Sequence, residues 1–130
     1  MFKAAGAYGR AGAHYRNVDV TSRIEGASPH KLVAILYEEL LNSLSGLKAA
    51  IEAKDDRRRR ESQERALTLL TALESSLDFE KGGEIAPLLA SVYREARRLV
   101  NDCAVLGHAA GAGEARKLIG EIASAWDAIG

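Results

Sequence analysis

Residues 28–51 read SPHKLVAILYEELLNSLSGLKAAI, and this stretch decides the fold class. Ser28 is of a residue type that caps free helix amides, and Pro29 suits the first helical position because its φ angle is already helical. Apolar side chains then recur at helical spacing, at Leu32, Val33, Leu36, Tyr37, Leu40, Leu41, Leu44, Leu47 and Ile51. They cover about half of a helical wheel, whereas a surface helix buries a stripe of roughly 100°. The pattern therefore predicts one long helix with apolar surface to spare.

Three further segments carry the same periodicity. A second helix is expected over residues 61–77, and a third from Glu84 to a break at Gly107, because glycine favours a helix end. A linker rich in glycine and alanine over residues 107–113 then precedes a short fourth helix. Four amphipathic helices with short connections predict an all-α fold, an antiparallel four-helix bundle.

Each of these later helices has one expected apolar face. The face of the second helix consists of Ala66, Leu69, Leu70, Leu73 and Leu77. That of the third consists of Ile85, Leu88, Leu89, Val92, Tyr93, Ala96, Leu99, Val100 and Cys103. That of the fourth consists of Leu118, Ile119, Ile122, Trp126 and Ile129. Leu67 projects to one side of the second face and adds to the spare apolar surface.

Residues 1–27 differ from the rest of the chain in composition. They begin with a stretch rich in glycine and alanine that shows no sustained period, as in a mobile segment. Phe2, Tyr8 and Tyr15 are large rings that a pure spacer would not need. We therefore expect residues 1–27 to form an N-terminal arm or short helix, mobile or docked, and residues 28–130 to form the helical bundle domain.

Composition excludes several classes of protein. The chain has 18 basic and 18 acidic residues, and phosphate binding normally needs a basic surplus, so nucleic acid is not an expected partner. The run Arg57–Arg60 has acidic residues on both sides, so we expect it to be a solvated turn and helix start. No apolar run is long enough for membrane insertion, and the N-terminus does not resemble a secretion signal. A single cysteine excludes an internal disulfide, and together these features predict a cytoplasmic protein.

No pattern in the sequence indicates catalysis, a cofactor or a metal site. His14, His30 and His108 are scattered and do not share the spacing of helical metal ligands. Cys103 falls on an apolar face, where an inert buried thiol is expected. The glycines at 111 and 113 lack the preceding strand and the following lysine-serine pair of a phosphate loop. We therefore expect a protein that is not an enzyme and has no small-molecule substrate.

Two segments resemble the signature sequences of a known family. Residues 27–38, ASPHKLVAILYE, resemble the opening of the first long helix in the flagellin-specific export chaperones, the FliS family. Residues 76–86, SLDFEKGGEIA, resemble the second and more specific signature of that family. Tyr15 upstream and Ala125-Trp126 near the end also match family positions, so the resemblance covers nearly the whole chain from Tyr15 onward.

The resemblance implies a cytosolic chaperone that binds the disordered C-terminal segment of flagellin and prevents its premature polymerisation. It also implies delivery of flagellin to the gate of the flagellar type III export apparatus, without a cofactor or metal. We expect the flagellin-binding groove to be lined by Leu32, Leu36, Leu40 and Leu67. Tyr15 and Val18 are expected to cover that groove in the empty protein and to contact the export gate once flagellin displaces them.

The residues by themselves leave the use of the spare apolar surface open. Such a surface can hold the apolar face of a partner helix, as in helix-in-groove recognition. It can equally be buried within the bundle, or by dimerisation of a structural or regulatory bundle. The self-associating bundle predicts a dimer whose population rises with protein concentration, and it predicts no complex with flagellin.

Overall fold

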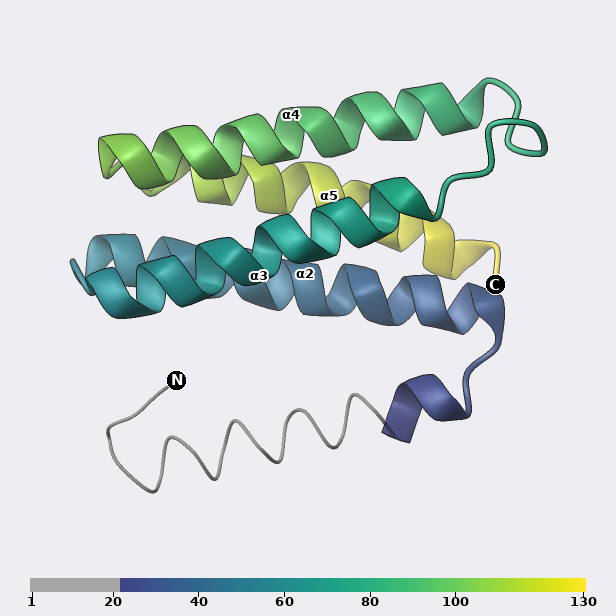
Figure 1. Cartoon of the computed structure of the whole chain (residues 1–130), viewed down its shortest axis with the longest axis horizontal. Coiled ribbons are helices and arrows are strands. Elements are labelled where there is room, and N and C mark those ends of the chain that lie inside the picture. The colour runs from purple at the N-terminus through teal and green to yellow at the C-terminus, as the bar shows by residue number, and fades with distance from the viewer. Residues whose placement is uncertain (1–21) are drawn as a thin grey trace.

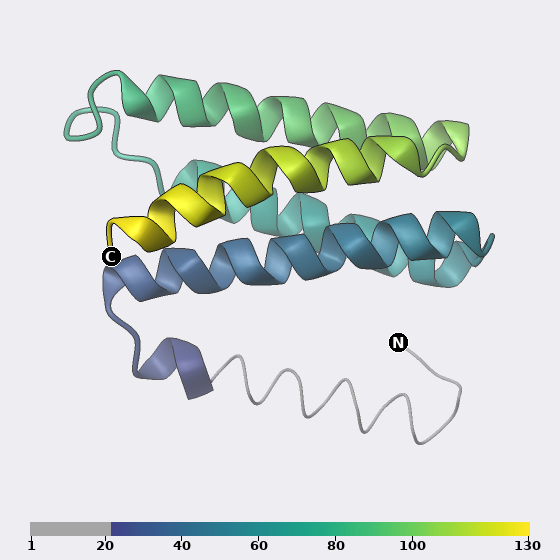
Figure 2. The same ribbon diagram turned by 180° about the vertical axis from the view of Figure 1, so that it is seen from behind.

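The computed structural model describes residues 22–130, so Tyr15 and Val18 lie outside the described residues. Its helices are α2 (Pro29–Glu52), α3 (Asp56–Ser75), α4 (Ile85–Leu106) and α5 (Ala110–Ala128), with one helical turn at residues 22–25 before them. Successive helices run in opposite directions, and α2 and α4 each pack against both α3 and α5 (Figure 1). The view from behind shows the same arrangement (Figure 2). The predicted all-α antiparallel four-helix bundle is confirmed.

The bundle has two ends that differ in construction. We call the end where α2 begins and α5 finishes the head end, which lies on the right in Figure 1, and the opposite end the tail end. The head end also carries the connection between α3 and α4, residues 76–84. The tail end carries the two shorter connections, 53–55 and 107–109. In the part of the chain that the structure describes, no helix is long and apolar enough to cross a membrane.

Helix α2 begins as the sequence predicts. The hydroxyl of Ser28 accepts a hydrogen bond from the backbone amide of Lys31 at 3.2 Å, and Pro29 is the first helical residue. The serine thereby satisfies one of the free amides of the first turn, and the proline lacks an amide that would need a partner.

Helix α3 begins earlier than predicted, at Asp56. The carboxylate of Asp55 caps it by accepting a hydrogen bond from the backbone amide of Arg58 at 3.1 Å. The run Arg57–Arg60 therefore forms the first turn of α3, so the predicted helix start is confirmed, whereas the predicted turn lies before the run. A capping aspartate next to a second aspartate, which suits the positive end of a helix, is the signal that the prediction overlooked.

Helix α5 corrects the predicted linker over residues 107–113. Gly107 ends α4 with a φ of 70°, as predicted, but α5 already begins at Ala110 and contains 19 residues. Gly111 lies within it because α4 and α5 approach closely here. A Cβ atom at Gly111 would lie 2.8 Å from the Cβ of Cys103 and 3.1 Å from the carbonyl oxygen of Leu99. These glycines and alanines form a helix contact and not a flexible connection.

Buried apolar side chains from all four helices fill the core. The largest fully buried ones are Tyr37, Tyr93, Ile35, Leu40, Leu44, Leu47, Leu70, Leu73, Ile119 and Val100. The predicted burial of Cys103 is confirmed, since its side chain is 2% exposed and its thiol donates a hydrogen bond to the carbonyl of Val100. Burial also raises the pKa of this thiol, which therefore stays protonated and unreactive.

Three residues assigned to apolar faces are exposed instead. Ile85 and Leu88 of α4 are 64% and 65% exposed, and Ile129 after α5 is 75% exposed. All three lie at the head end, where Ala86 and Ala90 take the inward positions of α4. A helical wheel assumes a packing neighbour along the whole helix, and at the end of a bundle this assumption fails. Ile85 lines the site described next, and Leu88 and Ile129 lie at the same end of the bundle.

Candidate functional site

An apolar pocket opens at the head end of the bundle. It has a volume of about 310 Å³ and draws its walls from α2, α4, α5 and the connection between α3 and α4. Its lining consists of Val33, Tyr37, Ser76, Leu77, Asp78, Lys81, Gly82, Ile85, Ala86, Leu89, Tyr93 and Trp126. We call it the head pocket. Concave, mainly apolar sites with a few polar groups are the usual form of a binding site.

The connection over residues 76–84 forms a compact turn beside this pocket. One carboxylate oxygen of Asp78 accepts hydrogen bonds from the backbone amides of Glu80 and Lys81, both at 3.0 Å. The amide of Gly82 donates to the carbonyl of Asp78 at 2.7 Å, so closely that a Cβ at this glycine would collide with that oxygen. The turn holds Phe79 at the surface, where its side chain is 55% exposed. We call the three exposed apolar side chains at this end, Phe79, Ile85 and Leu88, the apolar rim; of the three, Ile85 lines the pocket itself.

A pair of stacked rings joins α2 to α5 at the head end. The rings of His30 and Trp126 are nearly parallel, with centroids 4.5 Å apart. The indole nitrogen of Trp126 donates a hydrogen bond to the carbonyl of His30, and the His30 Nε2 donates one to the carbonyl of Trp126, each at 2.9 Å. Because a carbonyl only accepts, Nε2 carries the imidazole hydrogen when the ring is neutral. The stack holds the end of α5 against the start of α2.

Two buried tyrosines line the inner wall of the head pocket. Tyr37 of α2 and Tyr93 of α4 are 2% and 1% exposed, and their hydroxyl oxygens lie 2.6 Å apart in a hydrogen bond. Burial raises the pKa of both hydroxyls, and the contact with Tyr37 raises that of Tyr93 further. Both groups are therefore neutral hydroxyls at physiological pH. They belong to the lining of a mainly apolar pocket, which also includes Ser76, Asp78 and Lys81.

The four predicted groove residues occupy different environments. Leu40 has no exposed surface and belongs to the core, so it cannot contact a partner in this conformation. Leu36 and Leu67 are partly exposed and pack against the core, and Leu32 is partly exposed one turn closer to the head end. Leu32 and Leu36 are therefore the predicted residues of α2 that present apolar surface.

Leu36 and Leu67 also lie on different sides of the bundle. Leu36 is one turn from Glu39, whose carboxylate accepts a hydrogen bond from Arg65 of α3 at 3.0 Å. Leu67 is one turn from Gln63, which donates a hydrogen bond to Asn101 of α4. Because residues three and four apart share a helix face, Leu36 lies toward the α2/α3 side and Leu67 toward the α3/α4 side. Leu40 is buried in the core and the other three leucines are partly exposed, so the groove that the four were expected to line stays a prediction.

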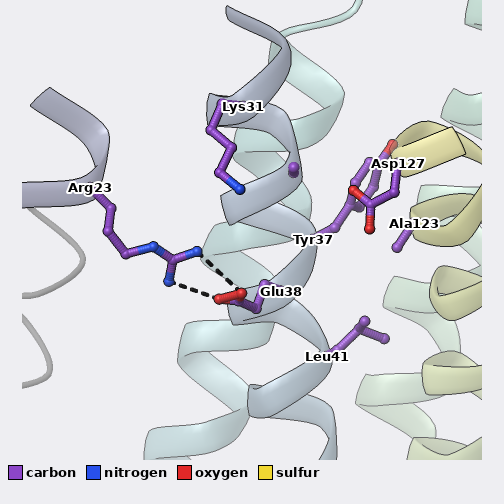
Figure 3. A pocket seen from close by; sticks show the side chains of 8 residues that line it. Arg23, Lys31, Tyr37, Glu38, Leu41, Ala123 and Asp127 are labelled. Atoms are coloured by element: carbon purple, nitrogen blue, oxygen red, sulfur yellow. Dashed lines mark hydrogen bonds and ion pairs between the residues drawn. The ribbon is translucent and has the colours of Figure 1, made fainter. Parts of the chain in front are cut away.

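An ion pair fixes the segment that leads into α2. Arg23 donates two hydrogen bonds to the two carboxylate oxygens of Glu38, at 2.8 and 3.1 Å (Figure 3). These hydrogen bonds lower the pKa of Glu38, and the charge of Lys31 acts in the same direction. The pair spans a shallow polar hollow of about 210 Å³ between residue 23, α2 and α5. The last residues before α2 are thereby held along the side of the bundle.

The described residues include no cluster of side chains suited to bind a metal ion. Across residues 22–130 no group of three histidine, cysteine, aspartate or glutamate side chains is placed to hold a metal ion. The polar side chains that line the head pocket are those of the two tyrosines, Ser76, Asp78, Lys81 and Trp126. Such a site can bind an apolar group and orient it by hydrogen bonds.

Comparison with known proteins assigns the chain to a family. A family model described as flagellar protein FliS matches residues 11–130. The chain belongs to the FliS family. The flagellar secretion chaperone FliS of Salmonella typhimurium is 31% identical over 116 residues, which cover 88% of this chain and 86% of the relative. The FliS protein of Vibrio cholerae is 33% identical over 118 residues, covering 88% and 85%, and the FliSB protein of Pseudomonas aeruginosa is 29% identical over 126 residues, covering 92% and 95%. The resemblance read from the two signature segments is confirmed.

The head pocket was not among the sequence predictions, although one signal for it existed. The second FliS signature segment, residues 76–86, supplies the compact turn, Phe79 and one wall of the pocket. A short segment that fixes a turn so closely and still exposes an aromatic ring indicates a binding role. The hydrogen bond between Tyr37 and Tyr93 had no sequence signal, because it joins residues 56 positions apart.

Proposed function

We propose that this FliS-family protein binds the C-terminal segment of flagellin in the cytoplasm, prevents its premature polymerisation and delivers it to the flagellar export gate. The observation that carries the proposal is the head pocket with its apolar rim. Isolated exposed apolar residues are ordinary, but an apolar pocket bordered by several of them is typical of an interaction site. The names of the relatives as flagellar secretion chaperones supply the kind of cargo.

Flagellin's segment suits this surface for a physical reason. A segment that is disordered until assembly exposes apolar side chains, and these aggregate or pair unless they are covered. An amphipathic segment can place one side chain in the head pocket and run along Leu32 and Leu36 of α2. Burial of its apolar surface, at about 25 cal/mol per Å², offsets the entropy lost when the segment becomes ordered.

The arm is the proposed regulatory part. In the empty protein Tyr15 and Val18 cover apolar surface that flagellin takes in the complex, and displacement frees Tyr15 for the export gate. The ion pair between Arg23 and Glu38 supports this proposal, because it directs the chain from the start of α2 back along the side of the bundle. Deletion of residues 1–18 should then raise the association rate of flagellin and increase self-association of the empty protein. Hydrogen exchange of the arm that is equal with and without flagellin would contradict competition.

The decisive experiment is co-expression with the organism's own flagellin, followed by size-exclusion chromatography. A 1:1 complex is expected. Leu88→Asp should weaken it at least tenfold without unfolding the bundle, because Leu88 is 65% exposed at the head end. Val105→Asp is the matched control, since Val105 is 83% exposed in the same helix but at the tail end. Equal weakening by both variants would exclude a specific head-end site.

Leu67→Asp tests the remaining predicted groove residue. If Leu67 contacts flagellin, this variant should abolish the complex while its helical circular dichroism is unchanged. Loss of helical signal would instead assign Leu67 to the core, which its contact with core residues also allows. A dimer that depends on concentration and no complex with flagellin would favour the self-associating bundle over the chaperone.

A further inference from the structure

The hydroxyls of Tyr37 and Tyr93 together have two hydrogens to donate, but the single hydrogen bond between them uses only one. Each tyrosine hydroxyl has one hydrogen to donate, and a hydrogen bond between two hydroxyls uses only one of the two. The second hydrogen therefore needs another acceptor. Within residues 22–130 the structure shows no hydrogen bond from either hydroxyl except the one they share. The pair is thus a buried donor with an unused hydrogen.

A buried donor without an acceptor is unfavourable, because it has lost its hydrogen bond to water. Both tyrosines line the head pocket, whose volume of about 310 Å³ leaves room for a group to reach the inner wall. In the empty protein a water molecule in the pocket can accept this hydrogen, since a water needs little space and a polar partner. Tyr37 and Tyr93 thus add a hydrogen-bond donor to the lining of a mainly apolar pocket, which also includes Ser76, Asp78 and Lys81.

We propose that the head pocket selects an apolar group that ends in a neutral acceptor oxygen, and that the tyrosine pair donates its unused hydrogen to that oxygen. This inference rests on the proposed function, because the group would belong to the bound flagellin segment. A backbone carbonyl and the side-chain amide of asparagine or glutamine are the two protein sources of such an oxygen.

A carboxylate is disfavoured as the acceptor. Asp78 lines the pocket, Glu80 and Glu84 flank the same turn, and Lys81 is the single basic residue among them. A second carboxylate would be moved out of water into an apolar site with acidic neighbours, which is costly. The chemistry of the site therefore favours a neutral amide oxygen.

The test measures flagellin binding to the wild type and to Tyr37→Phe, Tyr93→Phe and the double variant. Replacement of the tyrosine that donates to the cargo should weaken flagellin binding about three- to tenfold, as expected for the loss of one neutral hydrogen bond. The other single variant should stay within about twofold, because the donor to the cargo remains. Ser43→Ala is the matched control, since it removes a buried hydroxyl that bonds to the carbonyl of Glu39 and does not line the pocket.

Alanine substitution of each asparagine and glutamine in the flagellin segment distinguishes the two sources of the oxygen. If the acceptor is a side-chain amide, one such alanine substitution should weaken binding to the wild type. The same substitution should have no effect on binding to the double phenylalanine variant, which has already lost the donor. A backbone carbonyl predicts that the tyrosine effect is retained whichever amide side chain is removed. Wild-type protein that binds no flagellin would overturn the proposed function itself. Wild-type binding that all three phenylalanine variants match within about twofold would overturn only this inference.

Discussion

The head and tail ends of the bundle are closed in different ways. At the tail end Gly111 lets α4 and α5 approach until a single added Cβ would collide, and Ala112 and Ala115 next to it have no exposed surface. At the head end the rings of His30 and Trp126 span the gap between helices and leave a hollow of about 310 Å³. Small residues let the backbones of α4 and α5 come together, whereas the walls of the head pocket come from three helices and one turn. The tail end also holds a hollow, of about 380 Å³ between α2, the start of α3 and the end of α4, but the lining of this hollow is more polar. A mainly apolar lining is therefore what distinguishes the head pocket.

The two ends also differ in charge, although the chain as a whole has none. Residues 74–84 at the head end contain four acidic residues and one basic residue. Residues 48–61 at the tail end contain six basic and four acidic residues. The charges are thus distributed unevenly although their sum is zero. The net charge of the whole chain therefore says little about the charge of either end. A cargo segment that enters the head end is expected to be neutral or basic there.

The largest expected effect is that of Trp126→Ala, which tests whether rings close the head end. The variant loses the stack on His30 and the hydrogen bond from the indole to the carbonyl of His30, whereas the backbone carbonyl of residue 126 remains as an acceptor for the His30 Nε2. The free energy of unfolding should fall by about 3 kcal/mol. His30→Ala keeps the indole in place and should lose about 1 kcal/mol. Urea denaturation followed by circular dichroism measures both. A loss below 1 kcal/mol for Trp126→Ala would show that the stack does not hold this end.

Gly111→Ala addresses the tail end and should have the second-largest effect. Alanine normally stabilises a helix relative to glycine, but here its Cβ meets Cys103 and the backbone of Leu99, so a loss of about 1–3 kcal/mol is expected. Gly113→Ala is the control in the same helix, because the nearest atom to its Cβ is the flexible end of Lys48 at 3.7 Å. This variant should gain about 0.5–1 kcal/mol. If both variants were stabilised, the helices would not be in close contact at Gly111.

The fold was predictable because its signals are local. Ser28 and Pro29 mark one helix start, Gly107 marks a helix end, and the period of the apolar residues identifies the helices between such points. The start of α5 was missed because a run of glycine and alanine looks alike in a flexible linker and in a close helix contact. Only the distance from Gly111 to Cys103 distinguishes the two.

The candidate site was predicted in part, for the same reason. Leu36 and Leu40 are one turn apart on α2, but one is partly exposed and the other fully buried, because small rotations of a helix decide which residue faces its neighbours. The head pocket combines residues from three helices and one turn, so no single stretch of sequence contains it. Ile85 and Leu88 are exposed because no neighbouring helix covers them at the head end. A helical wheel does not show where the neighbouring helices end.

A smaller effect is expected for Lys54→Gly in the turn between α2 and α3 at the tail end. Lys54 has a φ of 56° and is the one residue other than glycine in the left-handed region among residues 22–130. Glycine adopts this conformation without the steric cost of a side chain, so the variant should gain about 1 kcal/mol in the free energy of unfolding. Ala53→Gly is the control, because Ala53 has a φ of −83° and a glycine there gains nothing. Flagellin binding should be unchanged in both variants, since the turn is remote from the head pocket.

The smallest expected effect concerns the ion pairs on α2. Arg23 and Glu38 make two hydrogen bonds across 15 residues of sequence, whereas Lys48 and Glu52 nearer the tail end make one contact of 3.3 Å within the helix. Both pairs are partly exposed to solvent, so each should contribute only a few tenths of a kcal/mol, about 0.5 for the first and less for the second. Double-mutant cycles with alanine, measured by urea denaturation, give the two coupling energies.

The pH dependence of the Arg23–Glu38 coupling follows from the pKa of Glu38, which Arg23 lowers from its ordinary value of 4.5. Folding therefore favours the ionised carboxylate, and the contribution is complete above the pKa of the unfolded chain. It is lost as the pH falls through the lower pKa of the folded protein. The coupling should persist from pH 7 down to about 5, decline below about 4, and weaken in 1 M salt. Because the ion pair holds residues 22–27 along α2, hydrogen exchange of that segment should speed up in Arg23→Ala at neutral pH. A coupling that is unchanged at low pH would mean that packing, and not charge, holds the entry to α2.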